Sequence, residues 1–177
     1  MMKLTIIEYP DKKLRLKSEE VKVFDANLHA LLDSMNDIMI NTNGIGLAAI
    51  QVEHPVRAIL LNIPDEDNEQ PPENLLELIN PVITKSSGEI LYDEGCLSVP
   101  TFYEETKRAE FLTLNYQDRD GNTKVIETEG LVSIAIQHEM DHLEGILFID
   151  RLTASRRRKF EKEYKRMLKS RKSKRRS

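Results

Sequence analysis

Residues 131–144 read LVSIAIQHEMDHLE and are apolar on nearly every side when they are wound as a helix. Such a helix leaves almost no face for water, so we expect it to be buried at the centre of the molecule. His138 and His142 are four residues apart and therefore lie one above the other on one face of the helix. Glu139 is rotated by about 100° from His138, so it can lie beside a metal ion held by the two histidines without binding it. This is the arrangement of the HExxH motif, which supplies two metal ligands and one general acid/base.

A bare HExxH pattern recurs by chance, and its alternative interpretation is two surface histidines on a helix. The apolar surroundings argue against that alternative here. Burial of His138, Glu139, Asp141 and His142 without partners would cost several kcal/mol. A metal ion accounts for these polar side chains in an apolar helix, and we therefore favour a metal site.

The third ligand distinguishes the classes of metal site that use such a helix. The extended HExxHxxGxxH pattern takes a histidine six residues after the second one, and this chain has Phe148 at that position. A glutamate on a later helix is another common solution, but the candidates Glu161 and Glu163 lie in a strongly basic segment. Cys96 is the only cysteine and is the better candidate. Alone it would be interpreted as a buried structural thiol, but beside an HExxH helix that lacks a third ligand we favour a metal-binding thiolate.

The segments around this helix predict an α+β fold. Apolar residues at three- and four-residue steps predict an amphipathic helix over residues 25–42, and a charged helix is expected over 153–169. Short strands are expected at 57–62, 75–80, 89–93, 111–117 and 123–127, with an exposed acidic loop at 64–74. The strands precede and separate two helices without βαβ alternation, which is typical of the α+β class.

Charge is distributed unevenly along the 177 residues. Residues 151–177 hold 14 of the 26 Lys and Arg residues and two of the 30 acids, so a segment of net charge +12 follows a body of net charge −16. A basic tail on an acidic body predicts an anionic partner, and nucleic acid is the usual one. We expect a catalytic domain over residues 1–152 and a basic C-terminal helix with a disordered tail over 153–177. No segment has the length of a membrane span or the layout of a signal peptide, so we expect a cytoplasmic chain with no membrane partner.

Three motifs stand in one order along the chain: GIGLAAIQ at residues 44–51, EGCLS at 94–98 and QHEMDH at 137–142. In this order and spacing they resemble peptide deformylase, and the resemblance covers residues 6–152. It implies antiparallel sheets packed around the helix that carries the two histidines. It also implies a hydrolase that removes the N-formyl group from the formyl-methionine of nascent proteins and releases formate.

The resemblance implies that Cys96, His138 and His142 are the metal ligands, with a fourth position left for water, and that Glu139 is the general acid/base. One divalent ion per chain is expected. Ligand chemistry alone, a thiolate and two imidazoles, predicts zinc, whereas the resemblance implies ferrous iron (Fe2+) as the native metal. Zinc, nickel or cobalt could occupy the same site in a purified sample.

Further roles implied by the resemblance concern the substrate. The Gln51 side chain and the Leu97 backbone N–H are expected to donate hydrogen bonds to the developing oxyanion. Gly46 is expected to offer a backbone group to the bound peptide. The residues expected to form the pocket for the methionine side chain are Ile45, Tyr92, Leu131, Ile134 and Ala135. A structural ion pair between Glu94 and Arg108 is implied as well.

The chain departs from the resembled pattern just after the cysteine. Thr101 stands where a glycine is frequent, and Tyr103 stands where many members have an arginine. These departures concern the rim of the peptide site and leave the expected chemistry unchanged. Two rival interpretations stay open: a metallopeptidase that cleaves internal amide bonds, and a ribosome- or RNA-binding module whose structural metal is closed by four protein ligands.

The basic segment has a narrow apolar stripe of Phe160, Tyr164, Met167 and Leu168, which could rest on the body or on a partner. The plainer alternative is a solvated helix with a frayed end. Because nascent chains emerge at the polyanionic surface of the ribosome, we expect this segment to bind the ribosome, and members of the resembled family are thought to dock there through a C-terminal helix. We expect a monomer, and we expect removal of the chain beyond Leu152 to change the cleavage of short peptides little.

Overall fold

The computed structural model describes residues 2–174, whose strands form a five-stranded and a two-stranded antiparallel sheet. The elements in chain order are η1 (Lys12–Arg15), α1 (Ala26–Asn41), β1 (Gly46–Ala48), η2 (Ala49–Val52), β2 (Ala58–Asn62), η3 (Pro72–Asn74), β3 (Leu75–Ser87), β4 (Ile90–Cys96), β5 (Val99–Arg108), β6 (Phe111–Gln117), β7 (Thr123–Glu129), α2 (Gly130–Leu143), η4 (Phe148–Asp150) and α3 (Ala154–Lys174). The larger sheet has the order β1-β2-β3-β6-β7, and the smaller one pairs β4 with β5. This is the expected α+β architecture. Over residues 2–174, no helix has the length and apolar character needed to span a lipid bilayer.

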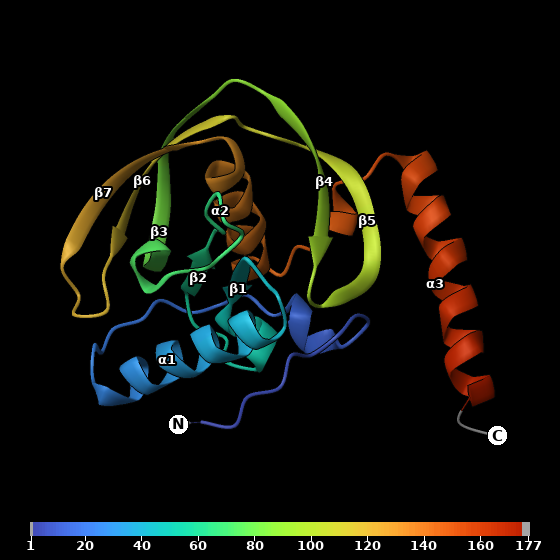
Figure 1. Cartoon of the computed structure of the whole chain (residues 1–177), viewed down its shortest axis with the longest axis horizontal. Coiled ribbons are helices and arrows are strands. Elements are labelled where there is room, and N and C mark those ends of the chain that lie inside the picture. Colours follow the sequence, from blue (N-terminus) through green and yellow to red (C-terminus); the bar gives the residue numbers. More distant parts are fainter. Residues whose placement is uncertain (1, 175–177) are drawn as a thin grey trace.

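Helix α2 lies between the sheets, with β3, β6 and β7 on one side and β4 and β5 on the other (Figure 1). Nine of its 14 residues are buried, including His138 and His142, which confirms the predicted central helix. The chain leaves the helix at Gly145, which takes a positive φ of 72°. A Cβ on residue 145 would lie 2.5 Å from the carbonyl oxygen of Arg15, so both the backbone angle and the close approach of another segment require glycine.

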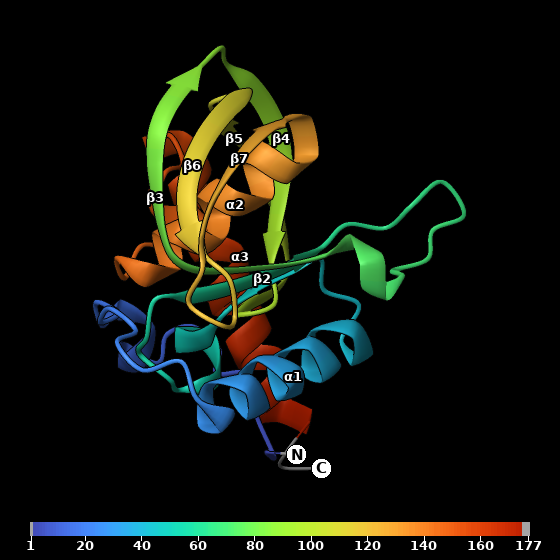
Figure 2. The ribbon, with the colours of Figure 1, turned by 90° about the vertical axis from the view of Figure 1, so that its left-hand side faces the viewer.

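Helix α1 covers the β1–β2 part of the larger sheet (Figure 2). The Asp25 side chain caps it by accepting hydrogen bonds from the backbone N–H groups of Asn27 and Leu28. Its buried apolar face consists of Leu28, Leu31, Leu32, Met35 and Met39. The predicted helix over residues 25–42 is therefore confirmed to within one residue at each end. In Figure 2 the loop before η3 projects away from the body, and the acidic segment predicted as a loop over residues 64–74 ends in η3.

Two strands of the structure are not predicted by the sequence pattern. β1 has only three residues, too few for an alternating pattern to be visible, and β5 is rich in charged side chains. β5 finds partners far along the chain, because Arg156 donates hydrogen bonds to the carboxylates of Glu104 and Glu105. β3 extends to Ser87 and β4 to Cys96, so Cys96 ends a strand that was expected to stop three residues earlier.

Helix α3 runs along the outer side of β5 (Figure 1). Phe160 is 1% exposed and belongs to a buried cluster with Phe102 and Phe148. The Tyr164 hydroxyl donates a hydrogen bond to the Tyr9 carbonyl at 3.0 Å. Phe160 and Tyr164 of the predicted apolar stripe therefore rest on the body of this chain, whereas Leu168 of the same stripe is 37% exposed. Residues 170–174, expected to be disordered, are helical, and the remaining expected tail at 175–177 lies outside the described residues.

Candidate metal centre and active site

Cys96, His138 and His142 converge, as the sequence predicts. Cys96 is the last residue of β4, and the two histidines lie on α2. One donor atom from each residue, the cysteine sulfur and a nitrogen of each imidazole, lies within 4.8 Å of the other two. The Cys96 Sγ is 3.4 Å from the His142 Nε2. Among residues 2–174, this is the only group of three or more His, Cys, Asp or Glu side chains with such geometry.

The donor set fits one divalent ion. A thiolate and two imidazoles suit a borderline or soft ion, and three protein ligands with a fourth position open are typical of a catalytic site. The Nδ1 of His142 is buried without a hydrogen-bond partner among the described residues. Burial, assisted by the charge on His138, lowers the pKa of His142 well below its usual range and keeps it in the neutral form that a ligand requires.

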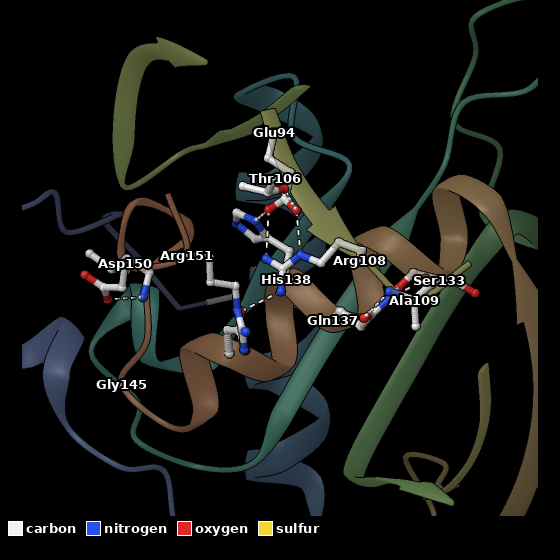
Figure 3. Close-up of polar contacts among 12 residues, drawn as sticks. Glu94, Thr106, Arg108, Ala109, Ser133, Gln137, His138, Gly145, Asp150 and Arg151 are labelled. Carbon is white, nitrogen blue, oxygen red and sulfur yellow. Dashed lines mark hydrogen bonds and ion pairs between the residues drawn. The ribbon is translucent and has the colours of Figure 1, made fainter. Parts of the chain in front are cut away.

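A network of charged side chains, which includes the buried Glu94 and Arg108, holds the His138 ring (Figure 3). The His138 Nδ1–H donates to Glu94 Oε2 at 2.7 Å, which leaves Nε2 for a metal ion. Arg108 donates to the two Glu94 oxygens at 2.6 and 2.9 Å and, from Nη1, to Asp141 Oδ2 at 2.7 Å. Arg151 Nε donates to the same Asp141 oxygen at 2.5 Å. Such a carboxylate partner fixes the orientation of a ligand imidazole.

Hydrogen bonding keeps Glu94 ionised in this charged network. Burial raises the pKa of Glu94, but the hydrogen bonds from Arg108 and His138 outweigh burial and bring the pKa down to about 2. For His138 the effects have the opposite sign. Burial lowers the pKa of His138, but the hydrogen bonds of the ring with Cys96 and Glu94 outweigh burial and raise this pKa well above the usual range. A cation that binds His138 therefore displaces a proton.

The sequence predicts only part of this network of charged side chains. The Glu94–Arg108 pair agrees with the resemblance. Asp141 is conspicuous as an acid on an apolar helix, but nothing in the sequence indicates that Arg151, ten residues later, turns back to pair with it. That contact depends on the turn after α2, in which Gly145 reverses the chain.

Glu139 lies beside the ligands and is 5% exposed. Its Oε2 has no hydrogen-bond partner among the described residues. Burial raises the pKa of Glu139 to about 7, and the charge on His138 offsets this only in part. A carboxyl group of this pKa can both accept and release a proton near neutral pH. The side chain packs against β1, where a Cβ on Gly46 would lie 2.5 Å from Glu139 Oε1.

Gln51 and Leu97, the expected oxyanion donors, both line the cavity beside Cys96. Gln51 is 1% exposed, and its Oε1 accepts a hydrogen bond from the Ala48 backbone N–H at 2.8 Å. Its Nε2 donates to Ser98 Oγ at 3.0 Å and lies 3.7 Å from Cys96 Sγ. The amide is thus held with its N–H groups toward the cysteine loop. Leu97 follows Cys96 directly and lines the same cavity as Gln51.

A cavity of about 380 Å³ opens beside the ligands. The residues predicted to contact substrate all line it: Ile45, Gly46, Tyr92, Leu131, Ile134 and Ala135. Tyr103 lies at the rim of the cavity and is 69% exposed. Its ring packs against Gly95, and a Cβ on residue 95 would lie 2.3 Å from the Tyr103 ring. Thr101 also lines the cavity and takes a positive φ of 68°, which explains why a glycine suits that position.

The cavity lies between two sheet edges. β1, which carries Gly46, is the outermost strand of the larger sheet, and β4, which carries Cys96, pairs only with β5. An extended peptide can form backbone hydrogen bonds with strand edges of this kind. The arrangement therefore suits a peptide whose end reaches the ligands.

The alternative ligands proposed from the sequence lie elsewhere. Glu161 and Glu163 are exposed on α3, and Glu161 pairs with Arg157. Neither belongs to the ligand group, and no fourth protein ligand joins the group within the described residues. The other histidines described are also engaged elsewhere, His29 with the Arg119 carbonyl and His54 with the Val52 carbonyl. The geometry does not match a structural site closed by four protein ligands.

Comparison with known proteins gives one consistent result. A family model described as polypeptide deformylase matches residues 3–158. The peptide deformylase of Wolinella succinogenes is 53% identical over 162 residues, which are 92% of this chain and 95% of the relative. That of Helicobacter pylori strain G27 is 51% identical over 174 residues, 98% of this chain and 100% of the relative.

Solved structures agree with the sequence comparison. A crystal structure of peptide deformylase from Plasmodium falciparum superposes with a TM-score of 0.87 at 36% identity, covering 96% of this chain and 98% of that one. One from Legionella pneumophila gives a TM-score of 0.84 at 35% identity, covering 93% and 96%. The likeness therefore extends over the whole fold, including the sheets around α2.

Proposed function

Because this chain belongs to the polypeptide deformylase family, hydrolases that remove the N-formyl group from nascent proteins, we propose that Cys96, His138 and His142 hold one divalent metal ion for that reaction. Glu139 is the general acid/base. The observation that carries this proposal is the convergence of the three donor atoms, within 4.8 Å of one another, beside a buried carboxylate with an unpartnered oxygen.

Each side chain has a defined part in the reaction. A divalent ion bound by the three ligands supplies Lewis acidity and lowers the pKa of water toward neutrality. Glu139 accepts a proton at Oε2 as water attacks the formyl carbon. The Gln51 Nε2–H and the Leu97 backbone N–H donate hydrogen bonds to the carbonyl oxygen as it gains negative charge. Glu139 then gives the proton to the amine nitrogen, because an amide anion is a very poor leaving group. The products are formate and a peptide with a free N-terminal Met.

Glu94 and the cavity walls support the reaction without exchanging protons. Glu94, ionised and held by Arg108, keeps the His138 ring oriented. The apolar walls at Leu131 and Ile134 favour the unbranched methionine side chain. Formyl-Met peptides should therefore react faster than formyl-Ala peptides, by about 1–3 kcal/mol per methylene-sized difference.

The native metal is ferrous iron in this proposal. A thiolate and two imidazoles also accept zinc, nickel or cobalt, so the ion found in a sample depends on how the protein is made. Ferrous iron and its thiolate ligand are both oxidisable, and peroxide should inactivate an iron-loaded protein quickly.

In this proposal the basic helix α3 binds the ribosome. A polyanionic RNA surface would attract this segment in a salt-dependent way and bring the enzyme to nascent chains. In this proposal, residues 1–152 carry the catalytic domain and 153–177 the basic segment. The chain acts as a monomer in the cytoplasm, where formylated nascent chains are made.

The proposal is tested by combining metal analysis with formate release. Protein made without oxygen should contain one iron per chain and release formate from formyl-Met-Ala-Ser. Acetyl-Met-Ala-Ser, with a larger acyl group, and peptides with only internal amide bonds should remain intact. Cleavage of internal bonds without formate release would instead favour the metallopeptidase interpretation.

A further inference from the structure

Residues 99–102 form a thin wall between two cavities. One side of this wall lines the 380 Å³ cavity beside the metal ligands. The other side lines a cavity of about 50 Å³ that lies under α3. The α3 residues that face the smaller cavity are Phe160, Glu163, Tyr164 and Met167. The C-terminal helix is therefore separated from the active site by a single segment of chain.

Three phenylalanine rings connect α3 to the ligand His138. The His138 ring stacks on Phe148 with centroids 5.9 Å apart, and Phe148 stacks on Phe102 at 6.2 Å. Phe160 of α3 meets Phe102 edge to face at 4.7 Å. Phe102, Phe148 and Phe160 are 7%, 1% and 1% exposed, so the rings are packed without intervening solvent. A displacement of one ring is transmitted to the next because close-packed interiors do not deform freely.

Ion pairs to β5 and an aromatic contact to Tyr9 hold α3 in place against the body. Arg156 donates to Glu104 Oε1 at 2.9 Å and to Glu105 Oε1 at 2.8 Å. Lys159 pairs with the second oxygen of Glu104 at 3.1 Å. Near the other end of the contact, Tyr164 packs edge to face on Tyr9 at 5.0 Å. Both ends of the Phe160 segment are thus anchored.

We propose that α3 is a positioning element of the active site, in which Phe160 acts on Phe102 of the wall 99–102 and, through Phe102 and Phe148, on the His138 ring. Phe160 is then a positioning residue that touches neither metal nor substrate. The inference goes beyond the proposed function and takes from it only that His138 binds the metal. It replaces the expectation that the chain beyond Leu152 can be removed with little effect.

Metal release provides a readout that does not depend on turnover. Full-length protein is loaded with Ni²⁺, and transfer of the metal to a chromophoric chelator is followed for the parent, Phe160→Leu and Phe160→Ala. We expect release to be about fivefold faster in Phe160→Ala, within the range for loss of an aromatic pair. Phe160→Leu, which keeps an apolar side chain, should lie between the two. KM for formyl-Met-Ala-Ser should rise in the same order, because the wall 99–102 faces the substrate cavity.

A matched control separates positioning from general destabilisation. Leu32 on α1 is 0% exposed and lies in a different core cluster. Leu32→Ala should lower the urea midpoint as much as Phe160→Ala does, because both remove a buried side chain, yet it should release Ni²⁺ at the parent rate. Parent-like release from both Phe160 variants, or equal acceleration by Leu32→Ala, would overturn the proposal. A parent protein that binds no Ni²⁺ would instead contradict the proposed metal site.

Discussion

Glu94 and Glu139 are both buried near the histidine ligands, but the pKa of Glu94 is lowered and that of Glu139 is raised. Glu94 accepts hydrogen bonds from Arg108 and His138, and its pKa falls to about 2. Glu139 has no partner at Oε2 among the described residues, and burial raises its pKa to about 7. One carboxylate is therefore suited to orient a ligand and the other to exchange a proton, a division of roles that follows from their partners.

Replacing Glu139 by glutamine keeps the shape of the side chain and removes its proton exchange. In Glu139→Gln we expect metal content to be retained and kcat to fall by about two or more orders of magnitude. The measurement is formate release with metal content determined on the same sample. Glu144→Gln, at the end of the same helix and outside the cavity, is the control and should keep near-parent turnover. Near-parent turnover in metal-loaded Glu139→Gln would refute the assigned role.

Loss of the Cys96 thiolate should remove metal and activity together. Alanine offers no donor, and two imidazoles alone bind a divalent ion far more weakly than three ligands. Cys96→Ala should therefore contain well under one metal per chain after dialysis. Glu161→Gln and Glu163→Gln should retain both metal and activity. One tightly bound metal per chain in Cys96→Ala would show that the upstream ligand is wrong.

Gly46 tests how closely Glu139 must be placed. A methyl group on residue 46 would lie 2.5 Å from Glu139 Oε1, so in Gly46→Ala either the carboxylate or β1 must move. We expect kcat to fall by about ten- to a hundredfold, since a displacement of about 1 Å can cost that much. Gly88→Ala, at a turn with a positive φ of 70°, is the control for backbone strain and should affect stability only. An unchanged kcat in Gly46→Ala would mean that the position of Glu139 is not critical.

Among the elements, η4 is short but joins the segments around the metal site. Its last residue, Asp150, accepts hydrogen bonds from Arg15, from Arg157 at 3.1 Å and from the Leu147 backbone N–H at 2.9 Å. η4 thereby ties the chain after α2 both to η1 and to α3. Phe148, which stacks on His138, is the first residue of the same element.

The Asp150 ion pairs predict a defined pH dependence of stability. Burial raises the pKa of Asp150, but hydrogen bonds from Arg15 and Leu147 outweigh it, so the folded-state pKa lies below the usual 3.8. The ionised group therefore stabilises the fold above pH 3.8, and this contribution is lost as the pH falls through the folded-state pKa. Asp150→Asn should lower the free energy of unfolding by about 1 kcal/mol at pH 7, because the partly exposed pairs are screened.

Urea unfolding of the parent and Asp150→Asn at several pH values checks this prediction. The difference between the two proteins should be constant from pH 5 to 7 and should shrink as the solution becomes more acidic than pH 3.8. Asp67→Asn, in the exposed acidic loop, should match the parent throughout. A difference that stays the same in acid would assign the effect to packing rather than to charge.

At the scale of the whole molecule, the basic residues of α3 form a positively charged surface along one side of the body. Among the cations of α3, Arg156, Arg157, Lys159 and Arg171 pair with carboxylates of the body, and others face solvent. Five of them are exposed and make no ion pair with the described residues: Arg158, Lys162, Lys165, Arg166 and Lys169. The packing of Phe160 and the outward charges therefore involve different side chains of α3 and can be tested separately.

Replacing these five cations by glutamine should weaken ribosome binding and leave formate release unchanged. The reason is that neutralised contacts to RNA phosphates reduce both affinity and its dependence on salt. The measurement is cosedimentation with ribosomes across a salt series. The control replaces five exposed body lysines, Lys3, Lys22, Lys85, Lys107 and Lys124, and should bind like the parent. Equal binding by the α3 variant at every salt concentration would show that the basic helix is only solvated.

Local sequence patterns were sufficient to predict the helix that carries His138 and His142 and the α+β fold class. The spacing of His138 and His142 on one helical face, and the apolar run that buries them, are properties of a single segment and its period. The lack of a third ligand on this helix indicated Cys96, the only cysteine, and the structure brings it to the histidines. The predicted helix at 25–42 and the strand at 111–117 depend on similarly local signals and are confirmed.

Contacts between distant segments could not be anticipated in the same way. β5 carries charges whose partners, such as Arg156, lie some fifty residues later, so its own pattern does not resemble a strand. The Arg151–Asp141 pair, the stacking of Phe148 on His138 and the docking of Phe160 likewise exist only once the chain has turned at Gly145. Period and composition report which side chains share one face of one element. Packing decides which elements face one another, and hence whether α3 is a free appendage or rests against the wall 99–102 of the active site.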